Sequence, residues 1–282
     1  MGTSASSTGP GSGVPFDPPW LDDIAPLQPG EEMPSDDVNQ EGGEHEQPPQ
    51  FATNPPEIAP PRRFYSARRA LGTFVRTGEQ ESFKKSAGHY SRTGMGGARN
   101  VASRMRTSTM TGANLFGILQ SARERTEPTI NEWIASLTER DAGAEAVVDE
   151  IIRRAAPNGG SLDETTCRES MAQAMEDLLT EKPNVDLLNL GDDDIWALTE
   201  SFLGYETFHR LFLDIGQVFE NSSLSPRAVV ARMNEMQDYL KAELCVQVEA
   251  LREKTPKAGS SSLQSVLQRA LKNTFLVYEG SL

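Results

Sequence analysis

The feature that most constrains the fold is a run of apolar residues between positions 192 and 219 whose spacing alternates between three and four. This spacing places the apolar residues on one face of an α-helix, because the helix has 3.6 residues per turn. Three aspartates at 192–194 begin the run, and negative charge is favourable beside the amino terminus of a helix. The pattern predicts a core-facing helix of about seven turns. Its apolar residues are Ile195, Leu198, Phe202, Tyr205, Phe208, Phe212, Ile215 and Phe219.

Comparable helical patterns occupy most of the chain after residue 62, and Gly- and Pro-containing breaks separate them. Residues 93–112 have weak periodicity and predict either a loop or a frayed helix over 98–106, with a clearer helix introduced at Thr111. No alternating apolar pattern longer than five residues indicates a strand. The sequence therefore predicts an all-α fold, a helical bundle. Helices are expected over 64–77, 79–90, 128–137, 142–156, 162–181, 192–219, 226–251 and 263–276.

The first 61 residues differ from the rest in composition, because they are rich in Gly, Ser, Pro and acid and have few apolar residues. So few apolar groups do not offset the entropy lost when a chain is ordered, and we expect residues 1–61 to be a disordered arm. Within it, Phe16 and Trp20 lie among prolines in the segment 14–24. Two alternatives stay open for this segment: a linear motif that docks in a partner groove, or a segment that packs back on its own helical domain.

Charge divides the chain into three blocks. Residues 1–61 hold eleven acidic residues and no basic one, residues 62–125 carry a net charge of +10, and residues 126–282 carry −13. We therefore expect three parts: an acidic arm over 1–61, a basic helical and Gly-rich region over 62–126, and an α-helical bundle over 127–282.

The basic region is the strongest local feature with no obvious structural explanation. Its arginines alternate with aromatic residues, a composition that can bind nucleic acid through phosphate contacts and base stacking. Two other interpretations stay open: docking of an acidic partner protein, and neutralisation by the acidic residues of the same chain. The candidate docking residues are Arg62, Arg63, Arg68, Arg69, Arg92, Arg99, Arg104, Arg106, His89 and Tyr90.

The residues needed for catalysis are sparse. The three histidines, His45, His89 and His209, are far apart in the sequence, and no phosphate-binding GxxxxGK[ST] motif occurs. We predict no catalytic residue, no metal site and no cofactor, and we do not expect an enzyme. The chain has two cysteines, no signal peptide and no long apolar run. We therefore expect a cytoplasmic protein that has no disulfide and does not contact a membrane.

The amino terminus has a distinctive chemistry. Gly2 follows the initiator Met, and no lysine occurs before Lys84. Once the Met is removed, the glycine α-amine, with a pKa of about 8, is the only amine on the arm. The start also fits the permissive myristoylation pattern MGxxx[ST], although lipidation is not the expected modification here.

Three blocks of the sequence resemble the QatB family of anti-phage proteins. They are the MGTS…GPGSGVP…PPW segment of residues 1–20, the Arg-rich PPRRFYSARRALGTFVRTG that begins at residue 60, and AGHYSRTGMGG, which begins at Ala87. Ala87 stands where the family pattern has Leu. The resemblance covers residues 1–20 and about 60–117, and over the helical remainder it is architectural.

The resemblance implies a non-enzymatic component of the Qat anti-phage defence system. It implies as partners a QatC-like (QueC-like) queuosine-pathway synthase homologue, a QatA-like ATPase and a TatD-like nuclease, QatD. A synthase of that kind activates a carboxylate with ATP and delivers it to ammonia, so a protein amine in place of ammonia would yield a deazaguanine conjugate. Gly2 is then the expected acceptor. The residues expected to contact the enzyme are Thr3, Ser4, Gly9, Pro10, Gly11, Gly13, Val14, Pro15, Phe16, Pro18, Pro19 and Trp20. A nucleic-acid-binding adaptor and a structural scaffold with a solubilising tail remain as alternatives.

Overall fold

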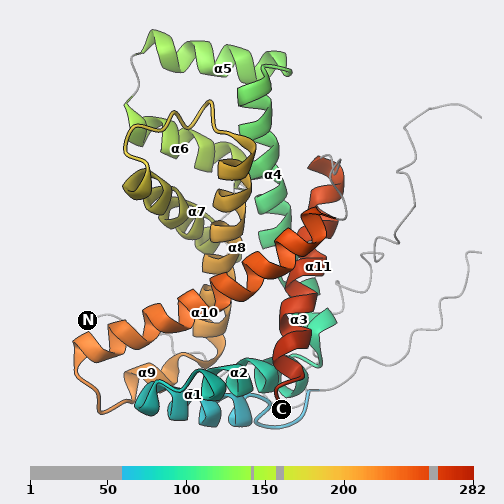
Figure 1. The fold of residues 1–282 in the computed structure, drawn as a ribbon, viewed down its shortest axis with the longest axis vertical. Helices are drawn as coiled ribbons and strands as arrows, with labels where there is room; N and C mark the ends of the chain where they lie inside the picture. Colours follow the sequence, from blue (N-terminus) through green and yellow to red (C-terminus); the bar gives the residue numbers. More distant parts are fainter. Residues whose placement is uncertain (1–58, 141–142, 157–161, 254–259) are drawn as a thin grey trace, which may run out of the picture.

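The described part of the chain is helical throughout. The computed structural model describes residues 59–140, 143–156, 162–253 and 260–282, which form eleven α-helices and one short π-helix and contain no strand. The all-α prediction is therefore confirmed (Figure 1). The α-helices are α1 (Tyr65–Thr77), α2 (Gln80–His89), α3 (Ala98–Arg104), α4 (Arg106–Glu124), α5 (Pro128–Glu139), α6 (Ala144–Ala155), α7 (Leu162–Glu181), α8 (Asp192–Ile215), α9 (Gln217–Glu220), α10 (Pro226–Arg252) and α11 (Ser260–Glu279).

Helix α8 lies at the centre of the bundle and packs against α4, α7 and α10. The predicted seam is correct as far as Ile215, but the helix ends there and Phe219 is buried from the separate short helix α9. Because α8 has neighbours on several sides, residues that fall off the seam are buried as well, among them Trp196, Leu203 and Leu211. Helix α8 therefore buries more of its surface than the single apolar face predicted from the spacing.

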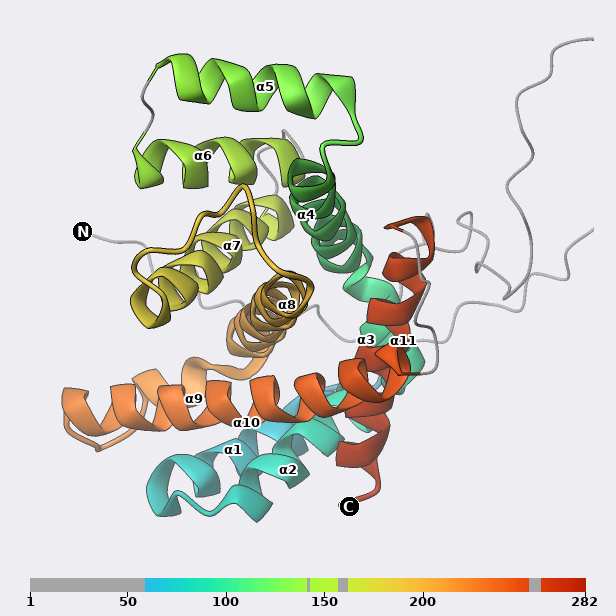
Figure 2. The same ribbon diagram turned by 45° about the horizontal axis from the view of Figure 1, so that its top comes forward.

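Helices α1 and α2 of the basic region lie at the end of the molecule opposite to α5 and α6, whereas α4, which is also part of this region, extends to α5 and α6 and packs on both (Figures 1 and 2). Helix α1 packs on α2 and α9, and Gly78 ends α1 in the left-handed conformation with φ 73°. This confirms the predicted end of the helix, since glycine adopts that conformation without steric cost.

The uncertain stretch 93–112 is mostly helical. Residues 98–104 form α3, and α4 begins at Arg106 instead of Thr111. Thr109 and Thr111 are buried within α4, which packs on α8 and α11. The predicted start at Thr111 is therefore wrong, because small and hydroxyl-bearing residues here are helix–helix contacts and do not mark a loop.

Two further boundaries agree with the sequence. Ser225 caps α10 by accepting a hydrogen bond from the Ala228 amide at 3.3 Å, and Pro226 is the first helical residue. Helix α7 spans 162–181 as predicted. One hydrophobic core cluster contains buried residues from both 62–126 and 127–282, so the two predicted regions share a core.

Candidate functional site

The proposed acceptor Gly2 and the predicted enzyme-contacting residues between Thr3 and Trp20 lie outside the described residues. The predicted site residues that the structure describes are those of the arginine block and its neighbours His89 and Tyr90. They separate into an exposed group and an internal group.

The exposed group consists of Arg62, Arg69, Arg92 and Arg99. Among the described residues, no ion pair to any of the four is found. These side chains are therefore the part of the arginine block that is accessible to an anionic partner.

The internal group connects α1 to the carboxyl end of α8. Arg68 is partly buried and donates from Nη2 to the backbone oxygen of Asp214 at 2.8 Å. Arg63 is 4% exposed, and its guanidinium lies 4.7 Å from the centre of the Phe64 ring. Arg104 and Arg106 are half-buried. Part of the basic block is thus used inside the protein.

Tyr90 belongs to this internal group. It is fully buried, its ring stacks on Phe64 with centroids 5.5 Å apart, and its hydroxyl donates to Oδ2 of Asp214 at 2.8 Å. Burial and the neighbouring Asp214 carboxylate raise the pKa of Tyr90 well above its usual value. The tyrosine thus joins the start of the π-helix, directly after α2, to α8 as a neutral hydrogen-bond donor.

The rest of the AGHYSRTG element forms the same junction. A Cβ added at Gly88 would lie 2.4 Å from the backbone oxygen of Tyr278, so α2 and α11 approach as closely as they do only because this residue is glycine. Ser91 donates to Oε1 of Glu279 at 2.5 Å, and residues 90–94 form the π-helix. His89 is half-buried, and burial lowers its pKa. Within this element Arg92 and Thr93 are exposed.

Sequence reasoning missed Glu206, a carboxylate on α8 that is only 4% exposed. Its Oε2 accepts from the Ser108 hydroxyl at 2.7 Å and from the Cys167 thiol at 3.4 Å, and its Oε1 accepts from Ser170 at 2.7 Å. One carboxylate therefore ties α4 and α7 to α8. Burial and the adjacent Glu206 charge raise the pKa of the Cys167 thiol. The apolar residues Trp196, Leu203 and Leu211 off the seam indicate a helix buried on more than one side, but they do not single out Glu206.

The surroundings of Glu206 have the residue types of a catalytic triad but not their arrangement. His209 Nδ1 lies 2.9 Å from Ser170 Oγ, yet the carboxylate contacts the serine and not the imidazole. In a triad the carboxylate orients the histidine, and the nucleophile faces substrate. Ser170 is fully buried, and the adjacent cavity of about 10 Å³ has room for about one water. Among the described residues no group of three metal-ligating side chains occurs.

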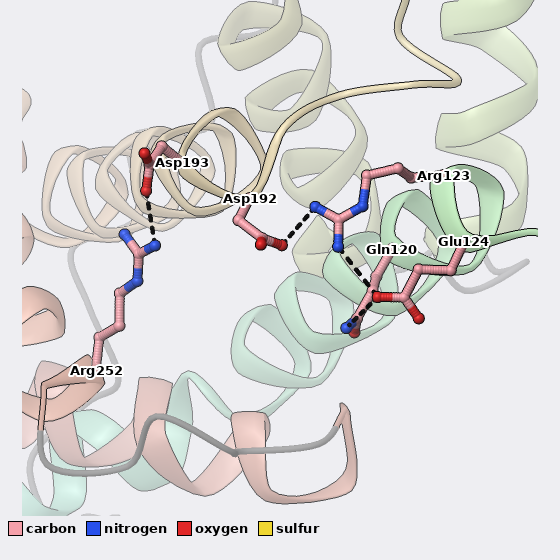
Figure 3. A network of polar contacts seen from close by, with 6 residues as sticks. All are labelled: Gln120, Arg123, Glu124, Asp192, Asp193 and Arg252. Atoms are coloured by element: carbon pink, nitrogen blue, oxygen red, sulfur yellow. Dashed lines mark hydrogen bonds and ion pairs between the residues drawn. The ribbon is translucent and has the colours of Figure 1, made fainter.

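At the amino end of α8, the three aspartates are matched by cations from other elements. Asp192 pairs with Arg123 of α4 at 2.5 Å, and Asp193 pairs with Arg252 of α10 at 2.7 Å (Figure 3). Asp194 pairs with Lys182 after α7 at 2.5 Å. Charges are thus neutralised within the protein at this end, in contrast to the exposed arginines of the block.

A family model, Qat anti-phage system associated protein QatB, matches residues 96–278. The chain belongs to the QatB family. The match extends from just before α3 to near the end of α11, so it lies almost entirely beyond the motifs that first indicated the resemblance and leaves out α1 and α2. No curated protein and no solved structure matches the chain.

Family membership makes the chain a component of the Qat anti-phage defence system, with other Qat subunits as partners. None of the helices in the described ranges is long and apolar enough to cross a membrane.

Proposed function

We propose that this protein is a non-enzymatic subunit that docks its Qat partners through the helical body and presents its amino-terminal arm to the QatC-like enzyme. Gly2 is the acceptor of a deazaguanine carboxylate that this enzyme activates with ATP. The observation that carries the proposal is the combination of QatB family membership with a lone amine at the tip of a lysine-free stretch of 83 residues.

The chemistry of the amines supports Gly2 over any lysine. Its α-amine has a pKa of about 8, against about 10.4 for lysine, so a larger fraction is neutral and nucleophilic at pH 7. The lysines with described ion pairs are held by carboxylates, as Lys84 is by Glu81 at 3.0 Å and Lys241 by Asp177 at 2.8 Å. The residues between Thr3 and Gly13 are mostly small, which suits a narrow active-site channel.

The test is the intact mass of the protein purified with and without the QatC-like partner. We expect a mass increase that depends on the partner and that maps to residues 2–16 after cleavage before Asp17. Gly2→Pro replaces the primary amine with a secondary one and should abolish the adduct, whereas the matched control Gly2→Ala keeps the primary amine and should retain it. An unmodified terminus in the coexpressed protein would refute the proposal.

The exposed arginines favour a second candidate, an adaptor that binds nucleic acid. Arg62, Arg69, Arg92 and Arg99 expose four positive charges, and phosphate contacts of this kind weaken steeply with salt. Reversing Arg92 and Arg99 to Glu should then abolish a gel shift with DNA or RNA while the mass adduct persists. Absence of any shift at physiological salt would exclude this function.

A further inference from the structure

Helix α1 and the segment that contains α9 enclose an open groove of about 470 Å³ on the basic end of the molecule. The apolar part of the lining, called the floor below, consists of Gly72 and Val75 from α1 and Val218 from α9. The walls carry guanidinium, amide and hydroxyl groups: Arg68, Arg69 and Arg76 on one side, and Gln217, Asn221, Ser222 and Ser223 on the other.

The groove has a positive charge that its described lining does not neutralise. Arg69 and Arg76 are exposed, and none of the lining residues that the structure describes is acidic. The exposed guanidinium groups of Arg69 and Arg76, together with the amide and hydroxyl groups of the opposite wall, suit the groove to a ligand that supplies carboxylates and hydrogen-bonding backbone groups.

We infer that this groove binds the acidic stem of the protein's own arm, residues 31–57. The stem holds eight of the eleven acidic residues of the arm and no basic residue, so its charge complements the groove. The residues that carry this charge are Glu31, Glu32, Asp36, Asp37, Glu41, Glu44, Glu46 and Glu57.

The point where the arm joins the body supports this occupant. Ala59 is buried at 3% exposure, and the amide of Tyr65 donates to the Arg62 oxygen at 2.8 Å in the turn that begins α1. The stem therefore starts beside the helix whose residues line the groove. A flexible stretch of about 13 residues spans roughly 20 Å, which is also about the length of the 13-residue α1, so the stem can reach the whole groove. A tether of this length gives the stem an effective concentration at the groove in the millimolar range.

The lining favours an acidic peptide over nucleic acid. No aromatic side chain is among the described lining residues, so bases have no surface on which to stack. The apolar floor instead offers a place for one apolar side chain of the stem, such as Phe51.

Docking of the stem has a consequence for the tip of the arm. It would anchor the arm on the basic end of the molecule and leave residues 1–30 to extend from there. The inference goes beyond the proposed function and does not depend on it, because the stem can dock whether or not Gly2 is modified.

The test is cleavage of the full-length protein by a glutamate-specific protease, followed by intact mass at early times. The arm supplies the cleavage sites Glu31, Glu32, Glu41, Glu44, Glu46 and Glu57, and a free synthetic peptide of residues 31–57 is the unprotected reference. For an intrinsic dissociation constant of about 0.1 mM, the tethered stem should be cut about tenfold more slowly than the peptide at low salt. High salt should remove the protection, after correction for the rate on the peptide.

The matched variants are Arg69→Gln/Arg76→Gln in the groove and Arg92→Gln/Arg99→Gln outside it, which remove the same charge. Only the groove pair should raise arm cleavage to the rate of the peptide, with circular dichroism melts showing that both pairs fold. The inference would be overturned if the wild-type arm is cleaved at the rate of the free peptide, or if the arm of the Arg69→Gln/Arg76→Gln variant is protected as well as the wild-type arm.

Two further results would assign the groove to another occupant and overturn the inference. One is a labelled single-stranded DNA that binds the wild type and not the Arg69→Gln/Arg76→Gln variant, and the other is protection of the arm only in dimers of the protein.

Discussion

Helix α8 holds its carboxylates in opposite ways at its amino end and near its middle. At the amino end, Asp192 and Asp193 have side chains that are 63% and 92% exposed, and each pairs with an arginine from another helix. Thirteen residues beyond Asp193 on the same helix, Glu206 is buried and accepts hydrogen bonds from two hydroxyls and a thiol. The same chemical group is thus a surface charge at one point of the helix and part of the core at the other.

This difference indicates where the bundle derives its specificity. An exposed ion pair gains little, because water screens it and two long side chains lose freedom, so its typical worth is about 0–1 kcal/mol. A buried carboxylate is costly unless every lone pair is used, and removing it leaves its donors unsatisfied. Glu206 therefore fixes the mutual positions of α4, α7 and α8, whereas the aspartates only adjust them.

The largest effect is expected from Glu206→Ala, which would remove the acceptor of the buried Ser108 hydroxyl and leave His209 Nδ1 as the remaining partner of Ser170. We expect a loss of about 1–3 kcal/mol in the free energy of unfolding from the buried hydroxyl left without an acceptor, measured by urea denaturation. Asp193→Ala on the same helix is the matched control and should cost less than about 1 kcal/mol. Equal losses for the two variants would remove the contrast between the amino end of α8 and the buried Glu206.

The sequence predicts α8 and most of its neighbours because their buried residues are apolar and recur at helical spacing. Ser225, Pro226 and Gly78 mark helix ends through local backbone chemistry, which is also readable without a structure. Glu206 could not be predicted in this way, since its burial depends on donors from α4 and α7 that come into place only in the folded bundle.

The arginine block shows the same limit of sequence reasoning. Composition identifies it as basic but does not separate Arg68, which donates to the Asp214 backbone, from Arg69 and Arg92, which are exposed. For Arg68 and Arg69, that distinction depends on which side of α1 faces α8 and α9. Tyr90 is also part of a junction between distant segments, and its partner Asp214 lies 124 residues away in the sequence.

Glu200, between the two ends of α8, sharpens the comparison. It is half-buried, and burial raises its pKa to about 6, although the Cys245 thiol donates to its Oε2 at 3.1 Å and partly lowers the pKa. The folded pKa exceeds the unfolded value of about 4.3, so the folded state binds the proton more tightly. Its contribution to stability is therefore present below about pH 4 and is lost as the pH rises through about 6.

Glu200→Gln should remove this dependence. Above pH 7 we expect the variant to be more stable than the wild type by about 1 kcal/mol, after allowance for solvent screening of the wild-type charge, and the difference should vanish near pH 4. Urea denaturation at a series of pH values measures it. Cys245→Ala removes the hydrogen bond that lowers the pKa of Glu200, so it should move the transition to higher pH. A difference between Glu200→Gln and wild type that is constant with pH would contradict the assignment.

The smallest effect is expected at the amino end, where a double-mutant cycle can isolate the pair of Arg123 and Asp192 (Figure 3). Arg123 also contacts Glu124 at 3.0 Å, so it keeps one carboxylate partner when Asp192 is replaced by Ala. We expect a coupling energy below about 1 kcal/mol that decreases further at 1 M salt, because exposed pairs are screened within a few ångströms there. The equivalent cycle for Arg252 and Asp193 is the comparison. Arg252→Ala should lower the free energy of unfolding slightly more than Arg123→Ala does, because the Arg252 guanidinium also lies 5.3 Å from the centre of the Trp196 ring. A coupling of several kcal/mol at either pair would mean that the exposed end of α8 specifies the packing as strongly as Glu206 does.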